Sequence, residues 1–388
     1  MITLLAKIFI KDSKNFGDTR VRHAYGVVCG AFGVFLNIVL FAAKLTAGIL
    51  SGSVAITADA FNNLGDAGSS VVTMVGFKMA GQKPDPEHPF GHGRIEYVTG
   101  LIVSMLIIVM GFELLKSSVD KIIHPQLPTL TPVVAGILIF SIIVKLYMYS
   151  YNTVTSAKIS SAAMKATALD SFTDSISTLV VLASSLIGYY TGWRVDGWCG
   201  LAVSIFVLYA GVTSAKDTMD PLLGSKPSED YVKAIEKFVT SYDDIIGIHD
   251  LVIHDYGPGR IMISLHAEVS ADRNIMDVHD TIDNIERRIN QTLGCQCVIH
   301  MDPVVVNDEA TDRMKRLCML IAKSVDEKFT IHDFRMVKGP SHTNLIFDVV
   351  APYDCKLSET EIRNTICAKV ESLPGNHYAV VEVDRPFV

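Results

Sequence analysis

Two aspartates lie inside an apolar stretch that is long enough to cross a lipid bilayer. Asp170 and Asp174 fall within residues 162–192, and a helix of about 20 apolar residues spans the hydrocarbon core. Because they are one helical turn apart, both carboxylates face the same side of that helix. Burying two neighbouring carboxylates in a membrane is costly unless a cation, a proton or a polar cavity compensates them. The stretch therefore predicts a functional site inside a membrane-spanning bundle.

A second apolar stretch repeats this arrangement of polar side chains. Asp59, Asn62 and Asp66 are spaced i, i+3 and i+7, so they lie along one stripe of a helix. Two stripes of oxygen ligands in two spanning helices predict one shared metal site. Asp59 has an alternative role as a packing or cavity residue, so the predicted site is built from Asn62 and Asp66. Lys44, in the preceding apolar stretch, is interpreted as a snorkelling or charge-balancing residue.

Composition agrees with a membrane protein that carries a soluble part. Hydrophobic residues make up 49% of the chain and charged residues only 19%, against roughly a quarter in soluble proteins. Long apolar runs end near residue 215, and charged, alternating segments follow Asp220. The net charge of −7, without a basic stripe, argues against binding to nucleic acid. The seven cysteines are scattered without a CxxC pair, so we expect free thiols.

Six membrane-spanning helices are predicted, at 24–50, 54–79, 95–119, 130–151, 162–190 and 198–215. Residues 1–23 contain five lysines and arginines and lack the pattern of a signal peptide, so we expect a cytoplasmic lead-in. An even number of spans places both ends of the bundle, 24–220, on one side. Basic residues concentrate in the lead-in and in the loops after the second and fourth spans, which predicts cytoplasmic termini.

The loop after the second span carries the sequence DPEHPFGHGR at 85–94. Asp85, His88 and His92 are suitable ligands for a divalent ion at the membrane edge. The alternative is an ordinary cytoplasmic loop with histidines at the interface, and spacing does not decide between the two. Arg94 begins the third span, where an arginine either snorkels or pairs with a carboxylate across the bundle.

Beyond residue 220 the sequence repeats itself. IHDLVIHDYGPGRIMISLHAEV at 248–269 resembles IHDFRMVKGPSHTNLIFDVVAP at 331–352, and CVIHMDPVVV at 297–306 resembles AVVEVDRPFV at 379–388. Each copy has a helical segment, two alternating segments around a turn, a second helical segment and a strand. The fold class predicted is therefore a membrane α-helical bundle of six transmembrane helices, followed by two tandem cytoplasmic α+β domains of αββαβ order at 221–307 and 308–388.

The first soluble copy concentrates metal-binding side chains. The candidates in strands and at a helix start are His249, His266, His279, His300 and Asp302. The sequence HMD places the last two on the same face of one strand. Any one of these histidines alone is more typical of a surface residue, and their clustering is what predicts a metal site. The second copy has mostly carboxylates at comparable places: His332, Asp348, Glu382 and Asp384. Metal binding is therefore expected mainly in the first copy.

Together these features resemble the cation diffusion facilitator family of metal/proton antiporters. The resemblance rests on the span order, the two polar stripes, the motifs HPFGHGRIE and GWRVDGW, and the soluble motifs GIHDL and VIHMDP, and it covers roughly residues 24–306. It implies a homodimer whose bundles each carry a metal site and whose cytoplasmic domains, similar to ferredoxin-like copper chaperones, meet and bind metal. It also implies a secondary active transporter, not an enzyme, that exports divalent metal ions by alternating access against protons.

The resemblance assigns roles to individual positions. It identifies four transport ligands: Asn62, Asp66, Asp170 and Asp174. The loop site corresponds to Asp85, His88 and His92. The cytoplasmic site corresponds to His249, His266, His279, His300 and Asp302. Arg94 and Asp220 are similar to a charged pair that interlocks spans three and six near the dimer interface.

The transport ligands also predict which metal is carried. Zinc-exporting members have histidine where Asp170 stands, whereas all four ligands here offer oxygen. Oxygen ligands suit harder ions such as Mn²⁺, and one asparagine with three aspartates resembles the manganese-exporting branch. We therefore expect export of Mn²⁺, with Zn²⁺ or Fe²⁺ as alternatives. The expected setting is a bacterial cell membrane, with metal, protons, lipid and a second copy as partners and no prosthetic group.

Charge suggests how transport is coupled. Without metal, three close carboxylates cannot all stay ionised in a low-dielectric bundle, so we expect them to hold a proton that the metal displaces. A rival from another class is a membrane-anchored metal sensor or scaffold, which does not require aligned acids in two separate spans. For the second soluble copy, 308–388, we expect an additional dimer contact in which the metal role is lost.

Overall fold

The computed structural model describes residues 2–16, 18–51, 54–124, 131–191, 193, 195–306, 308–339 and 341–385. The chain divides into two compact units. The first comprises Met1–Ser225 with the turn Tyr256–Arg260, and the second comprises Lys226–Asp255 with Ile261–Val388. Asn307, the predicted end of the first soluble copy, lies outside the described residues.

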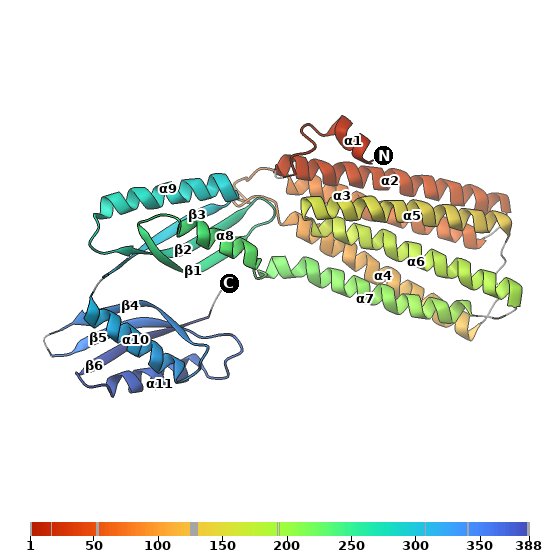
Figure 1. The fold of residues 1–388 in the computed structure, drawn as a ribbon. Helices are drawn as coiled ribbons and strands as arrows, with labels where there is room; N and C mark the ends of the chain where they lie inside the picture. Colours follow the sequence, from red (N-terminus) through yellow and green to blue (C-terminus); the bar gives the residue numbers. More distant parts are fainter. Residues whose placement is uncertain are drawn as a thin grey trace. The chain divides into compact units, whose positions relative to one another are not determined.

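Long helices build the first unit (Figure 1). Within its described residues they are α2 (Thr19–Ser51), α3 (Val54–Ala80), α4 (Ile95–Ile123), α5 (Pro132–Ile159), α6 (Ala162–Thr191) and α7 (Asp196–Leu223). All of these except α3 contain a described segment that is long and apolar enough to cross a membrane. A short helix, α1 (Ile2–Phe9), precedes them and is not predicted by the sequence pattern. The long helices correspond to the predicted spans in order.

α5 shows why predicted and observed helix ends differ. It continues to Ile159, although its apolar run ends near residue 151. The added turns carry Asn152, Thr155 and Ser156, which are buried. Hydropathy marks the part of a helix that contacts lipid, whereas polar residues packed against other helices extend it further. Ser160, in the left-handed conformation, ends the helix.

α4 and α7 pack against each other in antiparallel orientation. Gly100 of α4 faces Thr218 of α7, and Gly111 faces Leu208 further along. A Cβ atom at Gly111 would lie 2.9 Å from the Leu208 side chain, so a small residue is needed for this approach. The packing brings the start of α4 beside the end of α7.

A buried arginine joins three of these helices. Arg22 of α2 pairs with Glu96 in the first turn of α4, and the two side chains are 7% and 0% exposed. Its Nη2 lies 2.7 Å from Glu96 Oε1, and its Nε donates to the backbone oxygen of Ile159 at 2.6 Å. Arg22 lies in the predicted lead-in and is not singled out by the sequence pattern.

The second unit contains two copies of one element order. The first copy consists of α8 (Glu229–Val239), β1 (Ile245–Asp255), β2 (Ile261–Ser270), α9 (Ile275–Leu293) and β3 (Gln296–Val304). The second consists of α10 (Glu309–Lys323), β4 (Thr330–Lys338), β5 (Thr343–Val350), α11 (Glu359–Glu371) and β6 (His377–Asp384). In each copy the first two strands are antiparallel, and the third is parallel to the middle strand.

Each copy has its own hydrophobic core. Leu265 and Ile285 are fully buried in the first, and Phe347 and Ile366 in the second. Polar residues cap the N-termini of these helices. At Ser228, for example, the hydroxyl accepts a hydrogen bond from the backbone N–H of Tyr231. The cysteines at all seven positions are free, which confirms the prediction of thiols.

We predict that Arg22→Met lowers the free energy of unfolding by about 3–5 kcal/mol, because Glu96 would stay buried without its partner. The double variant Arg22→Met/Glu96→Gln should recover most of this loss, since no unpaired charge remains. Thermal unfolding in detergent micelles measures both. Arg20→Met, which removes an exposed pair with Asp18, is the control and should change stability little. Equal effects at the two arginines would contradict the prediction.

Candidate metal sites

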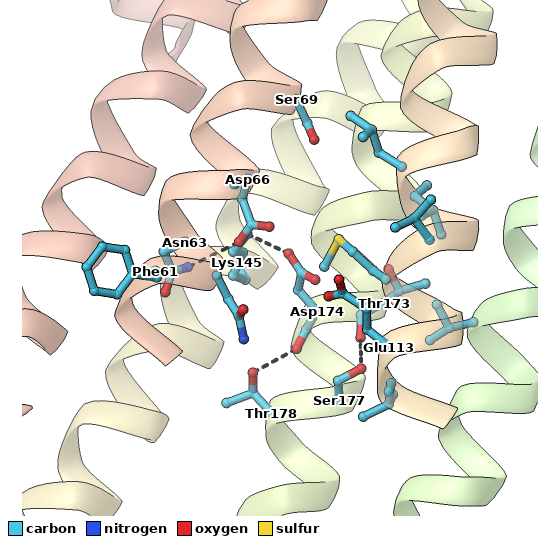
Figure 2. A pocket seen from close by; sticks show the side chains of 18 of the residues that line it. Phe61, Asn63, Asp66, Ser69, Glu113, Lys145, Thr173, Asp174, Ser177 and Thr178 are labelled. Atoms are coloured by element: carbon cyan, nitrogen blue, oxygen red, sulfur yellow. Dashed lines mark hydrogen bonds and ion pairs between the residues drawn. The ribbon is translucent and has the colours of Figure 1, made fainter. Parts of the chain in front are cut away.

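A polar cavity of about 490 Å³ lies among the helices of the first unit (Figure 2). It includes side chains from both predicted polar stripes. Its polar lining comprises Lys44, Asn62, Asn63, Asp66, Ser69, Glu113, Ser117, Ser141, Lys145, Thr173, Asp174, Ser177 and Thr178. The cavity is therefore lined by α2 to α7, of which α3 and α6 carry the two predicted polar stripes.

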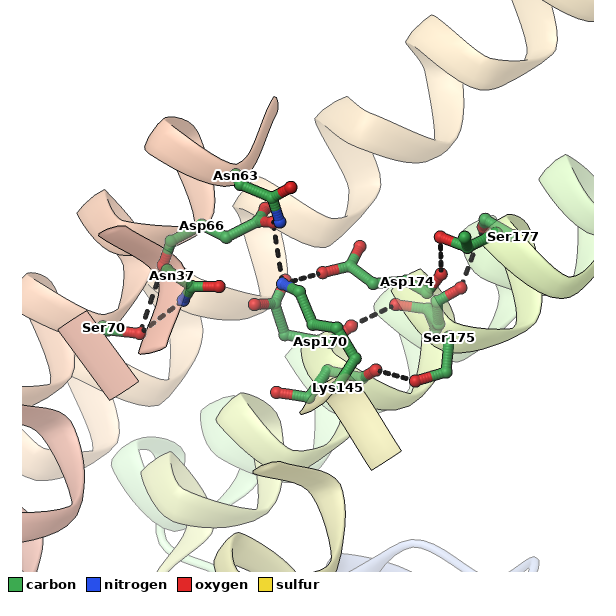
Figure 3. A network of polar contacts seen from close by, with 12 residues as sticks. Asn37, Asn63, Asp66, Ser70, Lys145, Asp170, Asp174, Ser175 and Ser177 are labelled. Atoms are coloured by element: carbon green, nitrogen blue, oxygen red, sulfur yellow. Dashed lines mark hydrogen bonds and ion pairs between the residues drawn. The ribbon is translucent and has the colours of Figure 1, made fainter. Parts of the chain in front are cut away.

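Asp66 of α3 and Asp174 of α6 share one cation, the ammonium of Lys145 on α5 (Figure 3). Lys145 Nζ lies 2.7 Å from Asp66 Oδ2 and 2.6 Å from Asp174 Oδ2. The lysine is only 2% exposed. A charge so far from water requires such partners, so the pairs hold α3, α5 and α6 together.

Lys145 was not predicted as a cavity residue from the sequence. The signal was available, because Lys145 is the one charged residue in the run VVAGILIFSIIVKLYM at 133–148. An ionisable residue inside a spanning helix is a candidate for function whatever its sign. The same argument predicts a functional site at Asp170 and Asp174, and Lys145 differs from them only in carrying a positive charge.

Asp170 lies one turn before Asp174 and is also buried. Among the described residues, no hydrogen-bond donor reaches its Oδ1. Asn63 donates from Nδ2 to Asp66 Oδ2 at 3.3 Å, whereas Asn62 lines the cavity and is exposed. The amide that touches Asp66 thus comes one position after the predicted ligand. The side chain of Asp59 lies outside the described residues.

Two further charged residues line the cavity. Lys44 of α2 is 2% exposed, which fits a charge-balancing role and excludes snorkelling. Glu113 of α4 was not singled out from the sequence. The cavity therefore combines carboxylates with two buried lysines, which reduces its net charge.

The three predicted loop ligands lie together. Asp85 Oδ1 is 3.2 Å from His88 Nδ1, and Asp85 Oδ2 is 3.4 Å from His92 Nε2. A hydrogen bond from the backbone N–H of His88 lowers the pKa of Asp85. One ligand atom from each residue lies within 4.8 Å of the others. The loop geometry can therefore hold one divalent ion.

Strand register gathers the ligands of the first soluble copy. His249 is opposite His266 in the β1–β2 pair, and His266 is opposite His300 in the β2–β3 pair. Asp302 Oδ2 lies 2.8 Å from His266 Nδ1 and 3.2 Å from His249 Nε2. Its Oδ1 is 3.4 Å from His300 Nε2. Asp302 thus contacts all three predicted strand histidines, and His249, His266 and Asp302 each offer a ligand atom within 4.8 Å of the others.

His279 does not join this group in the chain. It lies on α9, one residue after the buried Val278, and is exposed. The groups of ligand atoms that lie within 4.8 Å among the described residues do not include it. Its assignment to the cytoplasmic site stays a prediction.

The second copy repeats the register with different side chains. His332 is opposite Asp348, and Asp348 is opposite Glu382. His332, Asp348 and Asp384 offer ligand atoms within 4.8 Å of one another. Burial and the nearby carboxylate of Asp384 raise the pKa of Asp348 to about 6. The positions that the sequence analysis considered mainly non-metal therefore also converge.

The predicted interlock residues lie at matching ends of two packed helices. Arg94 is the residue at the N-cap of α4, and Asp220 lies in the last turns of α7. The antiparallel packing of these helices places both at the same end of the pair. A direct pair between Arg94 and Asp220 stays a prediction.

Two family descriptions match this chain. Residues 31–223 match "Cation efflux transmembrane domain" and residues 227–304 match "Cation efflux protein, cytoplasmic domain". Together they cover more than half of the chain and end before the second soluble copy.

Individual proteins match over the same region. The uncharacterized transporter MJ0449 of Methanocaldococcus jannaschii is 28% identical over 69% of this chain and 95% of its own length. The manganese efflux system protein MneS of Bacillus subtilis is 27% identical over 69% of this chain and 92% of its own. The cation-efflux pump FieF of Salmonella newport is 27% identical over 68% of this chain and 88% of its own.

We predict that Asp302→Asn weakens Zn²⁺ binding to the first cytoplasmic cluster about 10- to 100-fold, because this carboxylate positions three imidazoles. Competition with a chromophoric chelator measures the affinity of the full chain in detergent. Asp272→Asn, at an exposed position after β2, is the control. An unchanged affinity in Asp302→Asn would place the metal elsewhere.

Proposed function

Because this chain belongs to the cation efflux family, whose members are multi-pass membrane proteins that transport divalent metal ions, we propose that it exports Mn²⁺ from the cytosol in exchange for protons. Transport proceeds by alternating access in a homodimer with cytoplasmic termini. The ligands in the membrane are Asn62, Asp66, Asp170 and Asp174.

The pairing of Lys145 with Asp66 and Asp174 carries this proposal. Their oxygens lie 2.7 and 2.6 Å from the same ammonium nitrogen, so α3 and α6 already coordinate one cation between them. The unpartnered Oδ1 of Asp170 adds another acceptor one turn away. A membrane-anchored sensor would have no use for buried carboxylates around a polar cavity, which disfavours that alternative.

The ligand type favours manganese. Carboxylate and amide oxygens suit Mn²⁺, whereas zinc sites usually contain imidazole or thiolate. The name of the Bacillus subtilis relative, a manganese efflux protein, points the same way. The name of the Salmonella relative specifies only a cation, so Zn²⁺ and Fe²⁺ remain the alternatives.

Lys145 supplies the coupling. A divalent ion and an ammonium repel each other strongly at such distances in a low-dielectric site. Metal that enters from the cytosol therefore displaces the Lys145 ammonium from Asp66 and Asp174, and the amine gives up a proton. A proton that returns from the other side restores the ammonium, which expels the metal. This places the exchanged proton on Lys145, whereas the sequence alone suggested a carboxylate.

We expect Mn²⁺ uptake into proteoliposomes to require an imposed pH gradient and to be abolished by Asp174→Ala. Asp170→His should shift the preference toward Zn²⁺ by about tenfold, because it introduces an imidazole ligand. Asp217→Ala, which removes an exposed partner of Lys165, is the control and should transport normally. Native transport of Zn²⁺ without Mn²⁺ would refute the metal assignment, and the absence of gradient-dependent transport of either ion would refute the exchanger.

Two substitutions at Lys145 test the coupling. Lys145→Gln should bind Mn²⁺ at least about tenfold more tightly at neutral pH, since the competing charge is gone, and should release it poorly on acidification. Lys145→Arg should not transport, because a guanidinium keeps its proton. Equilibrium dialysis and the uptake assay measure the two effects, with Lys165→Gln as the matched exposed control. Normal transport by Lys145→Arg would exclude a proton on this residue.

A further inference from the structure

The second cytoplasmic copy, 308–388, follows the residues that match the family and takes no part in the proposed transport cycle. Its strands nevertheless place His332, Asp348 and Glu382 in the register that the first copy uses for its three histidines. A row of potential ligands is thus present in a segment whose composition suggested a lost metal role. His332, the first residue of this row, lies beside His249 and Asp250 of the first copy.

The two rows meet at His249 and His332, whose ring centroids are 4.8 Å apart. Asp250 lies between them. Its Oδ2 is 3.2 Å from His249 Nδ1, and its Oδ1 is 3.7 Å from His332 Nε2. Ligands about 2.0–2.2 Å from a tetrahedral ion lie roughly 3.3–3.6 Å from one another. The three side chains therefore already have nearly the spacing of a metal site.

An irregularity in β1 aims Asp250 at the second copy. The β1–β2 register shifts between His249 and Val252, and Asp250 adopts the left-handed conformation with φ of 50°. Aspartate tolerates this conformation, and a bulge redirects the side chain that carries it. The equivalent Asp333 has φ of 49° but pairs with Arg335 of its own copy. Asp250 therefore contacts a residue of the other copy, whereas Asp333 pairs within its own copy.

The charges around this point call for a cation. Asp250 and Asp302 have histidines as their ion-pair partners among the described residues, and so does Asp384. None of these three carboxylates forms an ion pair with a lysine or arginine among the described residues.

Two buried imidazole nitrogens also lack hydrogen bonds among the described residues. They are Nδ1 of His332 and Nε2 of His249, the second lying 3.2 Å from Asp302 Oδ2 without hydrogen-bond geometry. Buried polar atoms are normally hydrogen-bonded, so unsatisfied ones indicate a missing partner. These are the ring nitrogens opposite to the ones that approach Asp250, so the shared site rests on the spacing of His249 Nδ1, the Asp250 carboxylate and His332 Nε2.

We propose that His249, Asp250 and His332 form a divalent-metal site shared by the two cytoplasmic copies of one chain. Two imidazoles and a carboxylate select a zinc-type transition metal over Mg²⁺ or Ca²⁺. The site shares His249 with the first-copy cluster, through the opposite ring nitrogen, and differs from it in requiring His332 of the second copy. It does not depend on the transport proposal, because it uses no residue of the membrane cavity. The bound ion ties the second copy to the first.

The first test counts Zn²⁺ bound per chain at saturation, by equilibrium dialysis and elemental analysis of the full-length protein in detergent. His332→Gln should bind one Zn²⁺ fewer than the native chain. The control is His342→Gln, because His342 lies in the same copy beside Ser341 and Tyr378, and it should bind the native number. The native number in His332→Gln would overturn the proposal. Glutamine keeps a polar side chain of similar size, and an unchanged unfolding temperature of the metal-free variant shows that the fold is retained.

The second test asks whether one ion is shared. Asp250→Asn is suitable because asparagine also tolerates the left-handed conformation at this position. It should lose the same Zn²⁺ as His332→Gln, so the double variant should lose no more than either single one. Losses that add up to two ions would show separate sites and overturn the sharing.

The third test asks whether the site lies within one chain. Asp250→Asn and His332→Gln chains with different tags are co-expressed and purified together. A site within one chain stays broken in both chains of the mixture, so the Zn²⁺ count should equal that of the single variants. Recovery of Zn²⁺ above that count would assign the site to two neighbouring chains and overturn the proposal.

Discussion

Removing a carboxylate from water costs free energy that the interior of a protein recovers only by supplying positive charge or hydrogen bonds. This constraint shapes the membrane unit. Asp66 and Asp174, on different helices, both form an ion pair with Lys145 from a third helix, at 2.7 and 2.6 Å. These ion pairs therefore fix the position of α5 relative to α3 and α6. Any ion that binds there must compete with a charge that belongs to the protein, and this competition is a direct route to coupling.

In the cytoplasmic unit, buried carboxylates are compensated by different side chains than in the membrane unit. There the carboxylates are surrounded by imidazoles, which at neutral pH supply hydrogen bonds but little charge. His249 shows the balance: its burial lowers its pKa, but the hydrogen bond and charge of Asp250, together with the charge of Asp302, outweigh this and raise it. A membrane site built from oxygen and a cytoplasmic site rich in nitrogen suit different metals.

Much of the architecture follows from local patterns. The apolar runs, the alternation around the soluble turns and the internal repeat predicted the long helices and both αββαβ copies. Register also follows partly from pattern, since residues two apart on a strand share a face, as with His300 and Asp302. What local patterns missed were partners that are distant in sequence. Arg22 with Glu96 and Lys145 with two aspartates were not predicted, because nothing in the spacing of one helix reveals what a neighbouring helix presents.

The sequence by itself determined which residues share a face of one element, and hence that Asp170 and Asp174 point the same way and that His300 and Asp302 lie on one face of a strand. Helical and strand periodicity are properties of the local backbone, so they can be read without the fold. Only the tertiary structure decided which faces meet. It placed Lys145 between two helices, Asn63 rather than Asn62 on Asp66, and Asp250 beside His332. These contacts depend on helix packing and on a strand irregularity, which result from interactions across the whole unit and leave no mark in local spacing.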